Sequence, residues 1–319
     1  MAWNDRIGRR LKLRDLHILL AVAQAGSMAK AAKQLAISQP AISKAVGDME
    51  HVLGIPLLER GPQGVVPTQY GRALISRGLA VFDELRQGIN DIEFLADPTA
   101  GEVRLGSTEP LGASLITAAI DRISRRYPRI TFHVTLADIA ALHRDLQERN
   151  VEFVVSRVLG PLDDRQLKTD ILYDDPFVVA AGMHNPWARR RNVKLADLVN
   201  EQWVLSSETF IGSLVAEAFR ANGLEPPRAA VSTMSLNMRN SLLATGRFIS
   251  AVPGSMLRFP SRHPSIKALP IELSTMRRPI GIMALPNRIL SPVAELFITA
   301  LREVVNPPAE DKHTSLHKH

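Results

Sequence analysis

Two short helical segments and a glycine-bearing hairpin, between residues 27 and 68, limit the fold of this chain more than any other feature. Ser27 precedes the first segment and Ser38 the second, and a serine just before a helix accepts a hydrogen bond from a free backbone N–H. Pro40 falls in the first turn of the second segment, where its missing N–H is not needed. An earlier helical segment ends at Gly26. This order predicts a winged helix-turn-helix, which places one helix in the major groove of DNA.

The helix predicted after Ser38 has an apolar side and a polar side. The apolar residues recur at three- and four-residue steps, which predicts a buried helix face, and they are Ile42, Val46, Met49 and Leu53. The opposite side carries Gln39, Ser43 and Lys44. Gln and Ser can hydrogen-bond base edges, and Lys can hold phosphates. The alternative is that this polar side is only a solvated helix face. This alternative is less favoured because three helices and a hairpin occur together in the order of a DNA-binding motif.

The hairpin after Gly54 is predicted as two short strands, and Arg60 lies at its base, within reach of a phosphate or a narrow minor groove. The excess positive charge is concentrated in the same part of the chain. Residues 1–80 hold 11 Lys and Arg against 5 Asp and Glu, whereas residues 81–319 hold 28 against 27. Such asymmetry is typical of a nucleic-acid-binding module joined to a neutral domain.

The composition and the motif search argue against several kinds of chemistry. The chain has no cysteine, which excludes disulfides, cysteine-ligated zinc, iron–sulfur clusters and thiol nucleophiles. It has no apolar run long enough to cross a membrane and no signal-type core, so we expect a cytoplasmic protein without a membrane role. A phosphate loop, a dinucleotide fingerprint, a Gly-x-Ser-x-Gly elbow and paired metal-binding histidines are also missing. We therefore expect no cofactor, no metal and no enzymatic activity.

Residues 68–97 contain no proline and predict one long helix. Its apolar residues form one seam, and those that we expect in a dimer interface are Leu74, Phe82, Leu85, Ile89 and Ile92. A helix of this length cannot bury such a seam alone, so the pattern favours pairing with a second copy. The alternative is packing against its own C-terminal domain. Residues 98–102 contain proline and glycine and predict a hinge.

From residue 103 onward, short β-rich runs alternate with helical stretches, which predicts an α/β sheet with helices on both faces. We expect this domain to span residues 103–305 in two lobes, lobe I at about 103–160 and 276–305 and lobe II at about 161–275. Residues 306–319 are polar and are expected to be a disordered tail. Ligands of open α/β sheets bind beyond the carboxyl ends of the strands, here in the crevice between the lobes.

Residues 13–71 resemble, without a gap, the winged helix-turn-helix of LysR-type transcriptional regulators. The family's Ala-Ala pair appears as Ala31-Ala32, its Ser-Gln-Pro-Ala-x-Ser as residues 38–43, and its Leu-Glu-x-x-Leu-Gly as Met-Glu-His-Val-Leu-Gly in residues 49–54. Gly47 and Asp48 depart from the pattern, because relatives often carry polar or basic side chains there. Residues 101–106, Gly-Glu-Val-Arg-Leu-Gly, resemble the opening strand of the family's periplasmic-binding-protein-like effector domain.

The resemblance implies a regulator that binds promoter DNA under the control of a small-molecule effector held between the lobes. The expected DNA-binding residues are Ser27, Lys33, Ser38, Gln39, Pro40, Ser43, Lys44, Arg60 and Thr68. It also implies a homodimer through the long helix, a homotetramer through a second contact between sensor domains, and RNA polymerase as a partner. Two other classes stay open, a periplasmic-binding-type protein without a DNA role and an α/β enzyme.

Polar residues that follow predicted strands and precede helices are the candidates for effector binding. They are Ser107, Thr108, Glu109, Asp138, Ser207, Thr209 and Ser235. An ordinary helix-capping role is the alternative for each of them. Helix N-termini favour a carboxylate ligand, which Glu109 would oppose unless Arg157 neutralises it. A carboxylate, an aromatic acid, a sugar and an amine therefore all stay open.

Overall fold

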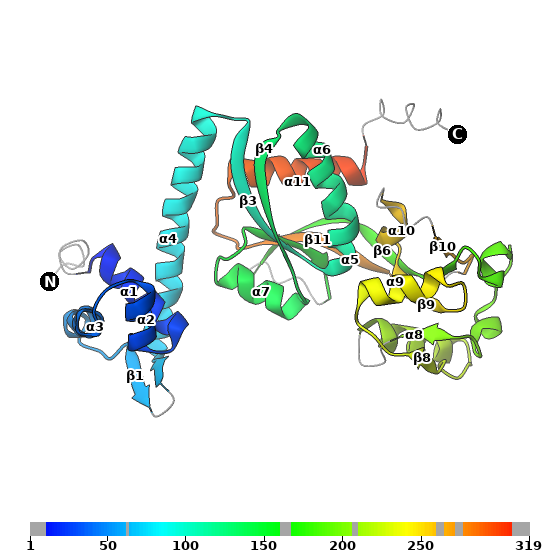
Figure 1. Ribbon diagram of the computed structural model, residues 1–319, viewed down its shortest axis with the longest axis horizontal. Helices are drawn as coiled ribbons and strands as arrows, with labels where there is room; N and C mark the ends of the chain where they lie inside the picture. The colour runs from blue at the N-terminus through cyan, green and yellow to red at the C-terminus, as the bar shows by residue number, and fades with distance from the viewer. Residues whose placement is uncertain are drawn as a thin grey trace. The chain divides into compact units, whose positions relative to one another are not determined.

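The computed structural model describes residues 11–61, 64–159, 167–205, 210–259, 265–271 and 277–307 (Figure 1). The chain divides into two compact units, Met1–Ile89 and Asn90–His319. Ser207, Thr209 and the predicted tail after residue 307 lie outside the described residues.

The first unit contains three short helices and a hairpin. The helices are α1 (Leu13–Ala25), α2 (Met28–Gln34) and α3 (Gln39–Leu53), and the strands are β1 (Leu58–Gly61) and β2 (Gly64–Pro67). The strands pair antiparallel, so the predicted wing is confirmed. The core holds fully buried apolar side chains from α1 and α3, among them Leu19, Ile42 and Met49. The periodicity of α3 therefore identified its buried face correctly.

The predicted helix starts are also confirmed. The Ser27 hydroxyl accepts from the Lys30 backbone N–H at 3.5 Å, and the Ser38 hydroxyl accepts from the Ala41 N–H at 3.4 Å. Gly26 ends α1 in the left-handed conformation, with φ of 63°. Its carbonyl then accepts a hydrogen bond from the Val65 N–H of the wing at 2.9 Å.

Glu50 connects α3 to the wing. Its carboxylate accepts hydrogen bonds from the backbone N–H groups of Leu57, at 2.7 Å, and Leu58, at 3.1 Å. These donors lie at the start of β1 and just before it. The glutamate of the sequence motif therefore orients the wing on α3, a role the motif alone did not reveal.

The long helix α4 (Gln69–Ala96) starts and ends close to the predicted limits. The predicted hinge at 98–102 is wrong in its last part, because β3 (Ala100–Ser107) already begins at Ala100 and pairs there with Arg129 of β4 (Arg129–Leu136). Only the turn around Asp97–Thr99 remains between helix and strand, and the Asp97 carboxylate accepts from the Thr99 hydroxyl at 2.7 Å.

The second unit is built on one long sheet with strand order β4-β3-β5-β11-β6-β9-β7-β8, and β10 pairs with β6 beside this path. Lobe I holds β3, β4, β5 (Phe153–Arg157) and β11 (Arg277–Ala284), with the helices α5 (Glu109–Leu111), α6 (Thr117–Arg126), α7 (Ile139–Gln147) and α11 (Pro292–Val305) and the π-helical turn η2 (Gly112–Ile116). Figure 1 shows α6 and α11 on one face of this half and α7 on the other. The predicted α/β sheet with helices on both faces is confirmed.

Lobe II holds β7 (Trp203–Val204), β8 (Ala229–Val231), β9 (Ile249–Pro253) and β10 (Ile266–Ala268), with the helices α8 (Phe210–Ala221), α9 (Leu236–Ala244) and α10 (Ser255–Arg258) and the 3₁₀ turns η3 (Pro186–Arg189) and η4 (Leu195–Leu198). Its core is centred on Trp203 and Phe219, whose rings meet edge to face at 5.8 Å.

The strand β6 (Lys168–Gly182) belongs to both lobes, which corrects the predicted boundary at residue 161. Residues 168–176 pair with β11 of lobe I, and residues 177–181 pair with β9 of lobe II. The part that pairs with β11 carries acidic residues and ends in Pro176, and both features disfavour a strand. Pairing with β11 overrides this local preference.

Candidate nucleic-acid interface and ligand pocket

The first turns of α3 present the polar residues predicted to read DNA. Ser38, Gln39, Pro40 and Lys44 are exposed, and so is Lys33 on α2. Ser43 is only half-buried, and its hydroxyl points back toward the Met28 sulfur at 3.2 Å. Ser43 is therefore less available to DNA than its place on the helix suggested. Gly47 is exposed and a Cβ there would meet no other atom within 4 Å, so this part of α3 is open to solvent.

Thr68 does not belong to this surface, which corrects its predicted DNA contact. The residue is buried, and its hydroxyl donates to the Pro56 carbonyl at 2.8 Å and accepts from the Gly71 N–H at 3.0 Å. It caps α4 and joins it to the segment before β1. Arg60 pairs with Val65 in the wing register, but its side chain lies outside what the structure describes.

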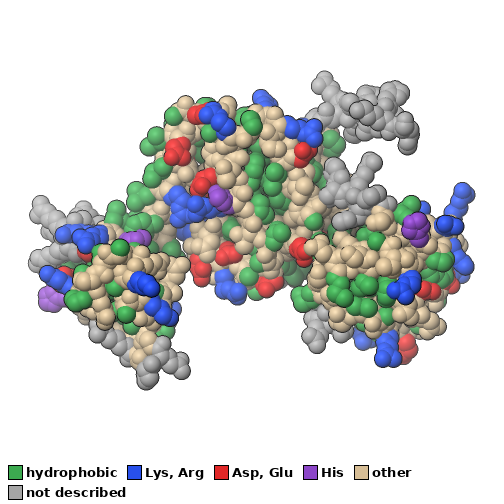
Figure 2. All heavy atoms as spheres, viewed as in Figure 1, with side chains coloured by type: hydrophobic (Ala, Val, Ile, Leu, Met, Phe, Trp, Pro, Cys, Tyr) green, Lys and Arg blue, Asp and Glu red, His purple; other side chains and the backbone are tan. Residues whose placement is uncertain are grey.

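The predicted seam of α4 separates into an inner and an outer row. Leu74 packs against the core of the first unit, and the Phe82 ring contacts the His17 ring edge to face at 5.6 Å. These two predicted dimer residues therefore hold α4 to its own unit. The outer row consists of five exposed apolar side chains, Val81, Leu85, Ile89, Ile92 and Leu95. We call this row the outer stripe. Figure 2 shows hydrophobic side chains on the surface of α4.

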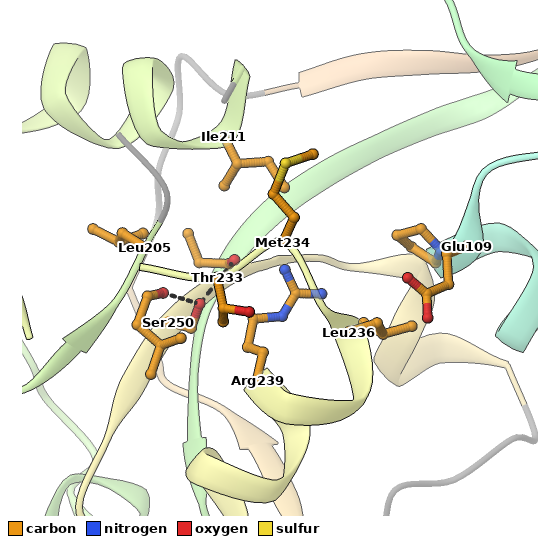
Figure 3. A pocket seen from close by; sticks show the side chains of 11 residues that line it. Glu109, Leu205, Ile211, Thr233, Met234, Leu236, Arg239 and Ser250 are labelled. Atoms are coloured by element: carbon orange, nitrogen blue, oxygen red, sulfur yellow. Dashed lines mark hydrogen bonds between the residues drawn. The ribbon is translucent and has the colours of Figure 1, made fainter. Parts of the chain in front are cut away.

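The second unit contains a pocket of about 250 Å³ lined by both lobes (Figure 3). Lobe I contributes Glu109 and Pro110 from α5. Lobe II contributes the rest, from the end of β7, the start of α8, the segment before α9, α9 itself and β9: Val204, Leu205, Ile211, Thr233, Met234, Leu236, Arg239, Ser250 and Ala251. The pocket thus lies in the crevice where the topology predicted a ligand.

Arg239 is the only basic residue among the described residues that line the pocket, and Glu109 is the only acidic one. Burial lowers the pKa of Arg239, and the negative charge of Glu109 acts in the opposite direction. One guanidinium nitrogen contacts the Met256 sulfur at 3.5 Å, and Nε has no hydrogen-bond partner among the described residues. In Figure 3 the two charged side chains point toward each other across the pocket.

Most of the predicted effector residues lie elsewhere. The Ser107 hydroxyl is buried and donates to the Val155 carbonyl at 2.8 Å, so it serves the sheet. Asp138 caps α7 by accepting from the Ala141 N–H at 2.8 Å, and Ser235 caps α9 by accepting from the Met238 N–H at 3.2 Å. Thr108 precedes α5 without lining the pocket. Of the predicted residues that the structure describes, only Glu109 lines it.

Arg157 does not neutralise Glu109, because it is paired inside the sheet. Its guanidinium lies 2.5 Å from the Asp175 carboxylate and stacks 4.2 Å above the Phe177 ring. The cation on which the charge of Glu109 acts is Arg239, which was not among the residues predicted from the sequence. One signal was available: Arg239 lies three residues after Leu236 and four before Leu243, on the buried side of α9.

The described residues contain no group of three or more His, Asp and Glu that could hold a metal ion. Within the same part of the chain, every helix is too short or too polar to cross a membrane.

A winged helix-turn-helix joined to a two-lobed α/β domain with a ligand-sized pocket defines a ligand-responsive transcriptional regulator. Two family models match the chain, one for bacterial regulatory helix-turn-helix proteins of the lysR family over residues 13–72 and one for the LysR substrate binding domain over residues 96–306. The chain therefore belongs to the LysR family of DNA-binding transcriptional regulators.

Curated relatives and solved structures agree with this assignment. The chain is 27% identical to the regulator GbpR of Azospirillum brasilense over 92% of this chain and 86% of that protein, and 25% identical to PcaQ of Agrobacterium fabrum over 93% and 96%. Full-length OxyR from Pseudomonas aeruginosa matches with a TM-score of 0.66 at 20% identity, covering 92% of this chain and 95% of that one. CbnR, a LysR family regulator, matches with a TM-score of 0.53 at 22% identity, covering 92% and 100%.

Proposed function

We propose that the pocket between the lobes binds the effector of this regulator and that its occupancy changes the affinity for operator DNA. The observation that carries the proposal is Arg239, a partly buried guanidinium whose Nε lacks a partner among the described residues and which faces a cavity shared by both lobes. Buried polar groups without partners are rare in native structures, and a ligand bound in this cavity would supply the missing partner.

A ligand that contacts both lobes favours one arrangement of them over others. The ligand can change the free energy of DNA binding by no more than the difference between its binding free energies for the two arrangements. That difference is typically about 1–3 kcal/mol. In this proposal the chain acts as a regulator and not as an enzyme. Its relatives are transcriptional regulators, and the described residues that line the pocket include one carboxylate and one guanidinium but no nucleophile paired with a general base.

The proposal extends to assembly and partners. The outer stripe of α4 pairs two copies, so that two α3 helices reach the half-sites of an operator. CbnR, which shares the fold, is known in a complex with its target DNA. A homotetramer, contact with RNA polymerase at the promoter and a cytoplasmic location complete the proposed function.

The decisive experiment fills the pocket. Thr233→Trp places a large ring in the cavity, and Thr108→Val changes a threonine outside it. Thermal shifts across a metabolite panel would identify an effector, and fluorescence anisotropy would measure affinity for DNA upstream of the protein's own gene. We expect Thr233→Trp to lose the ligand response while keeping operator binding, and Thr108→Val to respond like the wild type. A normal response in Thr233→Trp would show that the effector binds elsewhere.

A further inference from the structure

The pocket presents one acidic and one basic side chain, so a ligand with a single charge would match only one of them. Glu109 enters from lobe I and Arg239 from lobe II, and each is the only charge of its sign among the described lining residues. The described residues contain no hydrogen bond or ion pair between the two side chains, although each lies within the electrostatic field of the other. Two opposite charges therefore face one cavity with space between them (Figure 3).

The remaining wall of the pocket is mainly apolar. Leu205, Ile211, Met234 and Leu236 contribute aliphatic side chains or a thioether. Ser250 adds a hydroxyl that is already engaged, because it donates to the Val204 carbonyl at 2.7 Å. The Thr233 hydroxyl accepts a hydrogen bond from the Ser235 N–H at 3.1 Å. Both lining hydroxyls therefore already bond to the protein, and a sugar would find few partners here.

From this arrangement, and resting on the proposed effector site, we infer that the effector is a small zwitterion with an apolar side chain, of the class of aliphatic α-amino acids. Its carboxylate pairs with the Arg239 guanidinium, whose planar fork suits a carboxylate. Its ammonium pairs with Glu109, and its side chain lies against Leu205, Ile211 and Met234.

Electrostatics disfavour the simpler ligands. A carboxylate without an amine would gain Arg239 but would also lie close to the negative charge of Glu109, which it leaves unpaired. An amine without a carboxylate would gain Glu109 but would lie close to the positive charge of Arg239, which it leaves unpaired. A zwitterion satisfies both groups and bridges the two lobes at a defined separation.

The size of the cavity agrees with this class. An apolar cavity of about 150 Å³ holds benzene, so about 250 Å³ leaves room for a ligand somewhat larger than benzene. Valine, leucine and methionine are of this size.

The test compares whole and half ligands on the full-length protein by isothermal titration calorimetry. The probes are L-valine, L-leucine and L-methionine, then isocaproate, which is leucine without its amine, and isopentylamine, which lacks the carboxylate. We expect at least one amino acid to bind, and to bind about 10- to 100-fold more tightly than either half ligand, because each charge-assisted pair contributes that factor.

Two variants test which protein side chain binds which charged group of the ligand. Glu109→Gln should remove the preference for leucine over isocaproate, and Arg239→Met should remove the preference for leucine over isopentylamine. Glu109 is exposed, so its variant should fold normally, and Arg239→Lys provides a charged substitute of lower affinity at the partly buried position. The exposed residues Glu148 and Arg247 supply the matched controls Glu148→Gln and Arg247→Met, which should leave binding unchanged.

The outcomes separate this inference from the proposed function. The inference that the effector is a zwitterion would be wrong if isocaproate or isopentylamine bound as tightly as leucine. It would also be wrong if none of the three amino acids bound. The proposal that the effector binds in this pocket would still hold if another metabolite bound and Thr233→Trp abolished its binding. Amino-acid binding that persists in Thr233→Trp, Glu109→Gln and Arg239→Met would overturn both proposals.

Discussion

Arg157 and Asp175 form a buried ion pair at the point where β6 passes from lobe I to lobe II, with 2.5 Å between guanidinium and carboxylate. Asp175 also accepts hydrogen bonds from the Ser255 N–H, at 2.8 Å, and from the Ser255 hydroxyl, at 2.9 Å. Burial lowers the pKa of Arg157, and the negative charge of Asp175 opposes this effect. The pair therefore joins β5, β6 and α10 where the two lobes meet.

Asp175→Asn should destabilise the protein strongly. The substitution leaves the Arg157 cation buried without its counter-charge, and removing one partner of such a pair costs about 3–5 kcal/mol. Urea unfolding would measure the change. Asp121→Asn is the control, because Asp121 pairs with Arg125 on the surface and should cost less than about 1 kcal/mol. Equal effects of the two substitutions would contradict a structural role for the buried pair.

Gln39→Ala should weaken operator binding by about 1–3 kcal/mol and relax the sequence preference at one position, as expected when a base-reading contact is lost. Gln39 is exposed at the start of α3. Fluorescence anisotropy with a set of singly substituted operators would measure both effects. Gln24→Ala, at an exposed position of α1, should leave affinity unchanged. If every operator variant loses the same affinity with Gln39→Ala, the residue contacts the backbone and does not read bases.

The double substitution of Leu85 and Ile89 by Asp should convert the protein to a monomer and abolish operator binding with it. Both side chains lie in the outer stripe, 50% and 57% exposed in the single chain, and two buried charges per copy would prevent pairing. Analytical ultracentrifugation would report the mass. Glu84→Gln and Glu93→Gln, at exposed positions of the same helix, are the controls. A wild type that sediments as a monomer at micromolar concentration would refute the interface.

Gly71→Ala should destabilise the first unit, because an added Cβ would lie 2.0 Å from the Leu57 carbonyl oxygen where α4 crosses the start of the wing. We expect a cost of about 1–3 kcal/mol, the usual range for overpacking. Gly47→Ala, on α3, adds a methyl group in open space and should raise stability by about 0.5–1 kcal/mol. Thermal unfolding of both variants would measure the difference, and shifts of the same sign would contradict the packing of α4 on the wing.

Local signals in the sequence determined the DNA-binding unit. Ser27 and Ser38 set helix starts through hydrogen bonds to residues three positions later, and Pro40 fits the first turn of α3 because its missing N–H is not needed there. Gly26 ends α1 without a side-chain penalty. The structure keeps all of these features because each depends on a few neighbouring residues. The same signals were misleading at Asp138 and Ser235, because a hydroxyl or carboxylate before a helix usually serves the helix itself.

The sequence alone determined the LysR family, the winged helix and the alternating α/β pattern of the sensor domain. Only the tertiary structure decided that Thr68 is buried, that β6 spans both lobes and that Arg239 faces Glu109 across the pocket. Glu109 and Arg239 are far apart in the chain, so no periodicity links them. Their relationship depends on sheet pairing and on the packing of α9, which bring distant segments together through long-range contacts that no local pattern encodes.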